Sequence, residues 1–299
     1  RQLSQHPNRL QEPLMAENCY VLSRPENDLR LPLVCDSPHS GTIYPSDFRS
    51  ALSLQKLRQT EDTDIDALWS GVPAVGGTLV AALFPRCYID PNRSLEDLDP
   101  SLIDGTWPQP LAPGPKSKLG YGLIFGKVDA TSLIYDRQLS VSEIQQRIDR
   151  YWQPYRTVLD QEIQSAYQSF GQVWHLNLHS MPQNAYERLG IQTDKPLADF
   201  VLGDRDGTTC EPEFVGLVED SLKASGYTVA RNDPYKGVAL LEQIGQPTMH
   251  RHSLQIEIRR PLYMNEATRE RNHGFGTLKS ALDKTLSDVA TYVKGQITN

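Results

Sequence analysis

Two histidines and an acidic run in this sequence are of the residue types that hold a catalytic metal ion. His39 and His179 each follow a short apolar run, and residues 61–66 (EDTDID) place several carboxylates at the start of a helix-like segment. Two imidazoles and a carboxylate, with one position left open, form the ligand set of a catalytic zinc site. The alternative is a local role, in which the histidines are hydrogen-bonded turn residues and the carboxylates stabilise a helix N-terminus.

Glu257 is a second group that could do chemistry, because it lies inside the apolar run 254–258 (LQIEI). An ionisable side chain in such a strand needs a partner or a polar pocket, since burying an isolated charge is costly. Glu257 either pairs with Arg259 or Arg260, which follow it directly, or points into a pocket as an acid/base group. Both alternatives remain open at the level of the sequence.

Cations and an amide side chain follow another strand-like run, at residues 86–93 (RCYIDPNR). Arg86 and Arg93 together with Asn92 have the chemistry to hold a carboxylate, because a guanidinium group matches its two oxygens. Surface ion pairs with nearby acidic residues are the alternative for these arginines. Lys236, in the turn NDPYKG, is a further candidate cation, with a solvated turn lysine as its alternative.

The elements that must position these residues alternate along the chain. Apolar runs typical of strands occupy residues 31–35, 78–84, 173–178, 200–202, 227–230 and 254–258. Helical spacing predicts a helix from about residue 140 that kinks or restarts at Pro154, one from Pro212 to a stop at Gly226, and one from about residue 267. This alternation predicts an α/β fold with a mixed, mainly parallel sheet flanked by helices, and ligands gather at the carboxyl ends of such strands.

One stretch follows neither pattern. Residues 94–120 are rich in Pro and Gly, and we expect a loop. A loop of this length within a compact domain is typically functional or disordered.

The length and charge of the chain narrow the classes of protein further. Its 299 residues suit a single domain over residues 1–299, and the 38% hydrophobic and 22% charged residues are typical of a globular protein. Acidic residues outnumber basic ones by 37 to 30, and the net charge of −7 disfavours binding to nucleic acid. A local basic pocket for a small anion remains compatible with this charge.

Targeting signals and cysteines favour a cytoplasmic protein that does not bind membranes. No apolar run approaches the ~18 residues of a membrane span. The N-terminal segment RQLSQHPNRLQEPL lacks the apolar core of a signal peptide. The four cysteines are scattered and form no CxxC pair, which favours a reducing compartment over a thiolate zinc site.

Seven segments, taken in order and with their spacing, resemble the N-formylglutamate amidohydrolase family. They span roughly residues 30–270 and read CDSPHSGTIYP, TEDTDIDAL, FPRCYIDPNR, HLNLHSMP, ADFVLGDRDGTTC, NDPYKGV and SLQIEIRRPLYM. The resemblance implies hydrolysis of N-formyl-L-glutamate to formate and L-glutamate, the last step of one histidine-degradation route. It also implies the α/β fold of zinc-dependent exopeptidases (phosphorylase/hydrolase-like), a zinc ion or another divalent metal, and a small anionic substrate.

The resemblance implies roles for individual residues as well. His39 and His179 look like the zinc imidazoles, and the third ligand is either Asp62 or Asp64. Asp64 is preferred, because the recurrent element of the family's acidic segment falls there. Glu257 takes the place of the catalytic glutamate.

The substrate-binding residues follow from the same resemblance. Asn92 and Arg93 resemble the Asn-Arg pair with which zinc carboxypeptidases hold a substrate carboxylate, and Arg86 or Lys236 would stabilise the oxyanion. One departure is that carboxypeptidases take a histidine and a glutamate ligand from a single HxxE, whereas Thr42 stands at that fourth place here. Two other functions remain as alternatives: a zinc deacylase or amidase of another N-acyl amino acid or peptide, and a non-catalytic zinc or amino-acid binding module.

Overall fold

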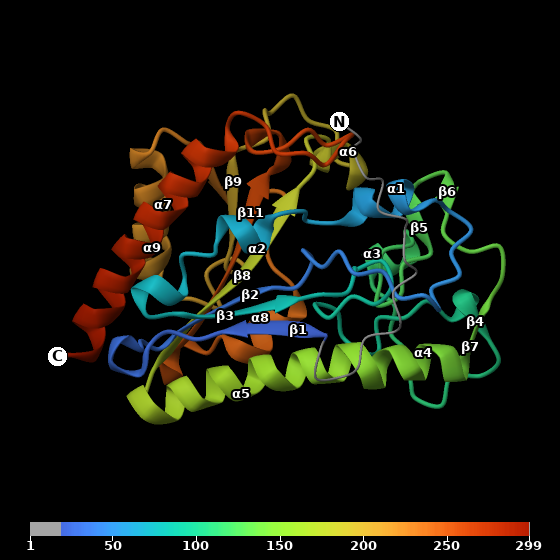
Figure 1. Cartoon of the computed structure of the whole chain (residues 1–299), viewed down its shortest axis with the longest axis horizontal. Coiled ribbons are helices and arrows are strands. Elements are labelled where there is room, and N and C mark those ends of the chain that lie inside the picture. Colours follow the sequence, from blue (N-terminus) through green and yellow to red (C-terminus); the bar gives the residue numbers. More distant parts are fainter. Residues whose placement is uncertain (1–18, 299) are drawn as a thin grey trace, which may run out of the picture.

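A seven-stranded sheet forms the centre of the molecule in the computed structural model, which describes residues 19–298 (Figure 1). Its order is β1-β3-β2-β8-β11-β9-β10. The strands are β1 (Tyr20–Ser23), β2 (Leu33–Ser37), β3 (Thr78–Ala82), β8 (Val173–Met181), β9 (Phe200–Gly203), β10 (Val229–Arg231) and β11 (Arg251–Arg259). Four neighbouring pairs are parallel and two, β1 with β3 and β9 with β11, are antiparallel. The prediction of a mixed, mainly parallel sheet is therefore confirmed.

The two central strands β8 and β11 extend beyond the runs predicted for them. β8 continues to Met181 because its backbone stays paired with β11 throughout, so His179 lies within the strand rather than after it. In this pairing His179 lies opposite Glu257. The extension therefore places both side chains side by side on the sheet.

Alternate strand residues pack on opposite faces of the sheet, as the two-residue period of a strand requires. In β2, Val34 packs on the side of α5 (Gln153–Phe170), whereas Leu33 and Cys35 pack on the side of α7 (Pro212–Ala224) and α9 (Phe275–Ile297). Figure 1 shows α5 running along one side of the sheet and α7 beside α9. Because both apolar clusters pack on the same sheet, we propose that these layers form one domain.

The helices depart from the predicted boundaries in two places. A π-helical turn, Ile148–Trp152, joins α4 (Val141–Arg147) to α5, which restarts next to Pro154, as expected for a residue that lacks a backbone N–H donor. α9 begins at Phe275 and not near residue 267, because Arg269 adopts a left-handed backbone conformation (φ 64°) that interrupts a helix. α7 begins at Pro212 and ends before Gly226 (φ 93°), as predicted.

Short elements connect these layers. They are α1 (Leu54–Leu57), α2 (Ile65–Leu68), α3 (Pro115–Lys118), α6 (Ala185–Arg188), α8 (Ala239–Ile244), β4 (Ile103–Asp104), β5 (Lys127–Asp129), β6 (Ser132–Leu133) and β7 (Leu139–Ser140). The Pro- and Gly-rich stretch 94–120 contains β4 and α3 and is held by its own polar groups. Asp97 accepts a hydrogen bond from the Gly114 N–H at 2.8 Å and its carbonyl accepts one from the Leu123 N–H at 2.8 Å.

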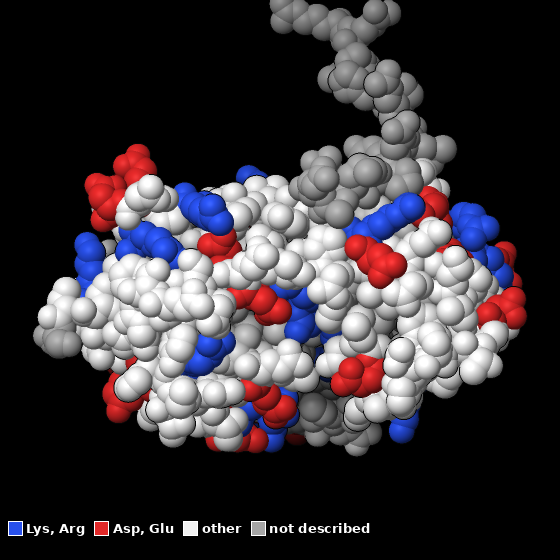
Figure 2. Space-filling model, turned by 90° about the horizontal axis from the view of Figure 1, so that it is seen from below, with Lys and Arg blue, Asp and Glu red and all other residues white. Residues whose placement is uncertain are grey.

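The surface and the helices also bear on the sequence predictions. In the part of the chain that the structure describes, no helix is both long and apolar enough to cross a membrane. Lys and Arg side chains are interspersed with Asp and Glu on the face seen in Figure 2, and no broad basic tract covers that face. The prediction made for the segment RQLSQHPNRLQEPL lies outside the described residues.

Candidate active site

Three neighbouring strands and one loop bring the predicted site residues together. His39 follows β2 by two residues, His179 lies in β8, and Glu257 lies beside it in β11. Asp62 comes from the loop before α2, and its N–H donates to the His39 carbonyl at 2.8 Å. The site therefore lies at the carboxyl ends of the central parallel strands, where an α/β sheet places its ligands.

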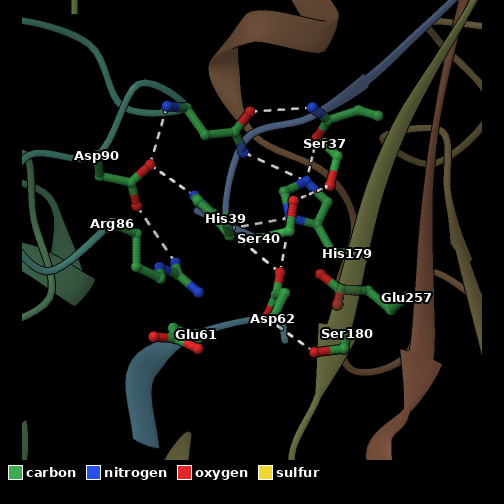
Figure 3. A network of polar contacts seen from close by, with 12 residues as sticks. Ser37, His39, Ser40, Glu61, Asp62, Arg86, Asp90, His179, Ser180 and Glu257 are labelled. Atoms are coloured by element: carbon green, nitrogen blue, oxygen red, sulfur yellow. Dashed lines mark hydrogen bonds and ion pairs between the residues drawn. The ribbon is translucent and has the colours of Figure 1, made fainter. Parts of the chain in front are cut away.

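His39, Asp62 and His179 form a buried cluster, which we call the His–Asp–His cluster (Figure 3). The two Nδ1 atoms lie 3.1 Å apart, and Asp62 Oδ2 lies 3.4 Å from each of them. In the described part of the structure this oxygen accepts no hydrogen bond of normal geometry. Three electron-pair donors thus converge on one position.

The spacing of these donors fits a small divalent metal ion. Zinc bonds of 2.0–2.1 Å in a tetrahedral site place neighbouring ligand atoms about 3.3–3.4 Å apart. The observed separations of 3.1 and 3.4 Å approach that value. Three protein ligands also leave the fourth position open, as a catalytic site requires.

Outer partners fix which nitrogen of each imidazole faces the cluster. His39 Nε2 donates to Asp90 Oδ1 at 2.6 Å, and His179 Nε2 donates to Asn177 Oδ1. Because these oxygens only accept, both protons lie on Nε2, and each Nδ1 presents a lone pair to the cluster. Outer partners of this kind are typical of metal-binding histidines.

Asp62 is oriented in the same way. Its Oδ1 accepts hydrogen bonds from Ser180 Oγ at 2.9 Å and Arg260 Nη2 at 3.1 Å, which leaves Oδ2 directed at the two imidazoles. Figure 3 shows this carboxylate pointing at His39 and His179, with Glu257 beside them. These contacts fix the direction in which Asp62 presents its free oxygen to the two imidazoles.

The electrostatics keep the donors in the forms that bind a metal. Burial lowers the pKa of His179 to about 4, so its imidazole is neutral at neutral pH. Burial alone would raise the pKa of Asp62, but His179, His39 and Arg86 hold it well below its ordinary value. Burial would also raise the pKa of Asp90, but the neighbouring His39 and Arg86 together have the larger opposite effect and hold this pKa below its usual range.

Glu257 lies in the wall of the same pocket and is not a structural partner of the adjacent arginines. Its Oε1 accepts a hydrogen bond from Gln255 Nε2 at 3.0 Å, while Oε2 has no partner among the described residues. Arg259 pairs with Asp199 at 2.8 Å, and Arg260 binds the carboxylate of the cluster. Burial, followed by the charge of that carboxylate, raises the pKa of Glu257 well above its ordinary value.

Three of the predicted substrate-binding residues line the pocket. Arg86 Nη2 lies 3.2 Å and Arg93 Nε 3.8 Å from Asp90 Oδ2. The Asn92 N–H donates to the other oxygen of Asp90 at 2.9 Å, and Asn92 Nδ2 lies 3.5 Å from His179 Nε2. Arg86, Asn92 and Arg93 therefore lie next to the His–Asp–His cluster, and all three contact Asp90, the hydrogen-bond partner of His39.

Asp64 and Lys236 lie elsewhere. Asp64 has a left-handed backbone conformation (φ 65°), and its carboxylate binds Arg271 at 3.0 Å, outside the cluster. The turn that directs Asp62 inward thus directs Asp64 outward. Lys236 is exposed and pairs with Asp206 at 2.8 Å, so its ammonium group does not line the pocket.

Sequence reasoning missed several groups that complete the site. Lys116, Arg188 and Tyr235 line the pocket but had no local pattern that pointed to it. Asn177 had a signal, because it lies between His175 and His179 on one face of a strand with a two-residue period. The other residues missed are Asp90 and Arg260.

A buried His–Asp–His cluster lies at the carboxyl edge of a mixed sheet, beside a glutamate with one oxygen that has no partner among the described residues. This arrangement fits a metal-dependent hydrolase. Comparison with known proteins defines the class more closely. The family model described as N-formylglutamate amidohydrolase matches residues 31–264, and the chain belongs to this family. The family predicted from the seven sequence segments is therefore confirmed.

Individual relatives agree with this assignment. The chain is similar to the crystal structure of N-formylglutamate amidohydrolase from Ralstonia eutropha JMP134, with 62% identity, a TM-score of 0.92, and coverage of 93% of this chain and 99% of that chain. It is 27% identical over 241 residues to the N-formylglutamate deformylase of Pseudomonas putida, which covers 79% of this chain and 83% of the relative. A gene product from Agrobacterium tumefaciens shares the fold at 18% identity, with a TM-score of 0.62 and coverage of 94% of this chain and 96% of that one.

Proposed function

We propose that this protein hydrolyses N-formyl-L-glutamate to formate and L-glutamate with the help of a divalent metal, and that the metal is zinc. The observation that carries the proposal is the open Oε2 of Glu257 beside the His–Asp–His cluster in a pocket rich in cations. The names of the relatives, N-formylglutamate amidohydrolase and N-formylglutamate deformylase, support the same substrate.

The charge of the pocket supports a dianionic substrate. N-formylglutamate carries two carboxylates, and its binding needs positive charge that this acidic chain must concentrate locally. The lining of the pocket carries five cationic side chains and one acidic side chain, Glu257. The cations are Arg86, Arg93, Lys116, Arg188 and Arg260. Asp62 and Asp90, which pair with three of them, balance the charge only in part.

His39, Asp62 and His179 are the residues that would hold the metal. When bound, a zinc ion lowers the pKa of a coordinated water and polarises a carbonyl oxygen. Asp90 and Asn177 keep the two imidazoles oriented toward the ion, as derived from their hydrogen bonds.

Glu257 acts as the acid/base group. Its unpartnered Oε2 accepts a proton from the attacking water, and the same carboxyl group then gives that proton to the amine nitrogen of the departing glutamate. Burial raises the pKa of this carboxyl group, so it takes up the proton of the water more readily than an ordinary carboxylate does. Arg93 and Asn92 hold the α-carboxylate of the substrate near the amide that is cleaved, with Arg86 beside them.

The substitution Glu257→Gln tests this function because it keeps the shape of the side chain and removes its ability to accept a proton. We expect kcat for N-formylglutamate to fall on the order of 10²–10⁴-fold, measured as formate release. Zinc content and thermal stability should change little. Glu242→Gln, on the exposed surface of α8, is the matched control and should retain full turnover.

The outcome also distinguishes the alternative functions. A zinc-loaded Glu257→Gln variant with near-normal turnover would contradict the acid/base role. Faster hydrolysis of N-acetyl- or N-succinyl-glutamate by the unaltered enzyme would indicate a deacylase of another acyl group. Binding of glutamate without hydrolysis of any of the three compounds would indicate a non-catalytic module.

We also propose that the reaction takes place in the cytoplasm. Cys19, Cys35, Cys87 and Cys210 are all free and buried. Unpaired cysteines are typical of a reducing compartment, where this substrate of amino-acid degradation would be formed.

A further inference from the structure

We propose that Lys116 binds the side-chain carboxylate of the substrate and thereby makes the enzyme selective for N-acyl amino acids with an acidic side chain. This inference rests on the proposed function and adds a specificity-determining residue to it. Lys116 belongs to α3, in the Pro- and Gly-rich stretch, and not to the strand and loops that carry the His–Asp–His cluster.

The backbone around Lys116 is fixed, so its side chain has a defined place in the pocket wall. Asp97 Oδ1 accepts a hydrogen bond from the N–H of Gly114, the residue at which the short helix starts, at 2.8 Å. The Lys116 carbonyl accepts one from the Tyr121 N–H at 2.8 Å. Lys116 and Tyr121 both line the pocket. The backbone hydrogen bonds of this stretch therefore hold part of the pocket wall.

The ammonium group of Lys116 differs from the other cations of the pocket. Each of the four arginines in the lining contacts an oxygen of a carboxylate or a carbonyl group. For Lys116, the described residues provide neither an ion pair nor a side-chain hydrogen bond, and Nζ lies 5.3 Å from the ring centroid of Tyr235. A lysine packed over an aromatic ring and without an anion is ready to receive one.

The electrostatic surroundings favour a carboxylate as that anion. Burial, followed by the nearby Arg93, lowers the pKa of Lys116 to about 8, whereas Glu257 opposes the shift. Lys116 therefore stays largely protonated at neutral pH, but with unfavourable desolvation and repulsion from like charges. A bound carboxylate relieves both costs, since it supplies an opposite charge and hydrogen-bond acceptors.

The geometry of N-formylglutamate assigns the side-chain carboxylate, and not the α-carboxylate, to Lys116. One carbon atom separates the α-carboxylate from the amide nitrogen, so this carboxylate must stay near the cluster. Arg93 and Asn92 lie there, in contact with Asp90, the hydrogen-bond partner of His39. The side-chain carboxylate is two methylene groups farther away. Lys116 lines the same pocket, from α3, and its charge acts on Glu257 and Arg93 without an ion pair or hydrogen bond to the cluster among the described residues. It can therefore receive the second carboxylate while Arg93 receives the first.

The test combines Lys116→Met with a pair of substrates that differ only in the side-chain charge, N-formylglutamate and N-formylglutamine. We expect kcat/KM for N-formylglutamate to fall on the order of 100-fold, mainly through KM, because a desolvated charge pair is lost. The value for N-formylglutamine should change less than about threefold, because no charge pair is broken. Lys118→Met, in the same short helix but with an exposed side chain, is the matched control and should leave both values unchanged.

Equal losses for both substrates, or an unchanged preference for N-formylglutamate, would overturn the inference. Lys116→Gln provides a second neutral side chain should the methionine variant fail to fold, and thermal melting and zinc content check both variants. If the unaltered protein hydrolyses neither substrate, the proposed function fails. Calorimetric binding of L-glutamate and L-glutamine then still tests the subsite: it stands if only the glutamate affinity depends on Lys116, and it falls otherwise.

Discussion

His39 and His179 both direct Nδ1 at the centre of the His–Asp–His cluster, but the groups that accept their Nε2 hydrogens differ in charge. A charged carboxylate, Asp90, accepts the Nε2 hydrogen of His39 at 2.6 Å, whereas a neutral amide, Asn177, accepts that of His179. The two outer partners also lead to different parts of the molecule. One side of the His–Asp–His cluster is thus linked to the pocket arginines and the other mainly to the protein core.

On the first side, Asp90 contacts both the imidazole and the two arginines that we propose bind the substrate. Its Oδ1 binds His39 and the Asn92 N–H, and its Oδ2 faces Arg86 at 3.2 Å and Arg93 at 3.8 Å. One carboxylate therefore orients a metal ligand and sets the position of two guanidinium groups. A change at Asp90 must affect both metal binding and substrate binding.

On the second side, Asn177 is held by a buried polar network between the sheet and α5. Its Nδ2 donates to Asp36 Oδ1 and to Asn92 Oδ1, each at 3.0 Å, so its Oδ1 has to face His179. Asp36 in turn accepts hydrogen bonds from His175 at 2.7 Å and from Tyr155 at 2.7 Å. Among the described residues, this network meets the lining of the pocket at His179 itself and at Asn92.

The largest effect on zinc affinity is expected at Asp62, whose Oδ2 faces both histidines. In Asp62→Asn, the oxygen stays with the donors Ser180 and Arg260, so the new NH₂ group faces the two imidazoles and cannot bind a metal. Zinc affinity should then fall by much more than the roughly 10–100-fold typical of an outer partner. Asp64→Asn is the matched control and should retain metal and activity. Equal zinc loss in both variants, measured by competition with a chelator, would contradict the assignment.

An intermediate effect should separate the two sides. Asp90→Asn removes the charge that His39, Arg86 and Arg93 share, so we expect zinc affinity to fall roughly 10–100-fold and KM for N-formylglutamate to rise as well. Asn177→Leu should lower zinc affinity by a similar or smaller factor. KM should rise less than in Asp90→Asn, because the change acts on the proposed substrate-binding residues through the hydrogen bond to Asn92 and leaves both arginines paired with Asp90. The measurements are chelator competition and steady-state kinetics. An equal rise in KM in both variants, or no rise in either, would remove the distinction between the two sides.

The smallest effect concerns stability in acid and tests the charge on Asp90 directly. Its folded-state pKa lies below its ordinary value, so the ionised form stabilises the fold above about pH 4, and this contribution is lost as the pH falls further. The difference in melting temperature between the metal-free protein and Asp90→Asn should therefore shrink from pH 7 to pH 3. The control Asp206→Asn, in an exposed ion pair, should show a small difference at every pH. A constant difference for Asp90→Asn would mean that its charge does not contribute to stability.

Much of the site was predictable because it depends on local patterns. His39 and His179 stood out because they follow apolar strand-like runs, where ligands gather, and Glu257 stood out because it interrupts such a run. The order of strands and helices likewise predicted a mixed, mainly parallel sheet, since crossover connections favour parallel neighbours. The structure brings these three residues together, with His179 and Glu257 on adjacent strands and His39 just after the strand on the other side of β8.

The choice between similar residues was not predictable in this way. Asp62 and Asp64 lie in one acidic run, and only the left-handed turn at Asp64 decides which carboxylate faces the imidazoles. Lys116 and Lys236 both lie in Pro- and Gly-containing segments, and only the packing of α3 against the pocket decides which ammonium group lines it.

The sequence by itself therefore determined the fold class, the family and the chemical types of the active-site groups, because the period of buried side chains and the order of motifs are properties of the chain. Tertiary structure alone decided which carboxylate completes the cluster, which lysine enters the pocket, and that Asp90 and Asn177 orient the two imidazoles. The physical reason is that each of these depends on the direction of a side chain relative to residues far away in the sequence. Asp62 Oδ2 faces His179 from 117 positions away, and one turn of backbone reverses that direction for Asp64.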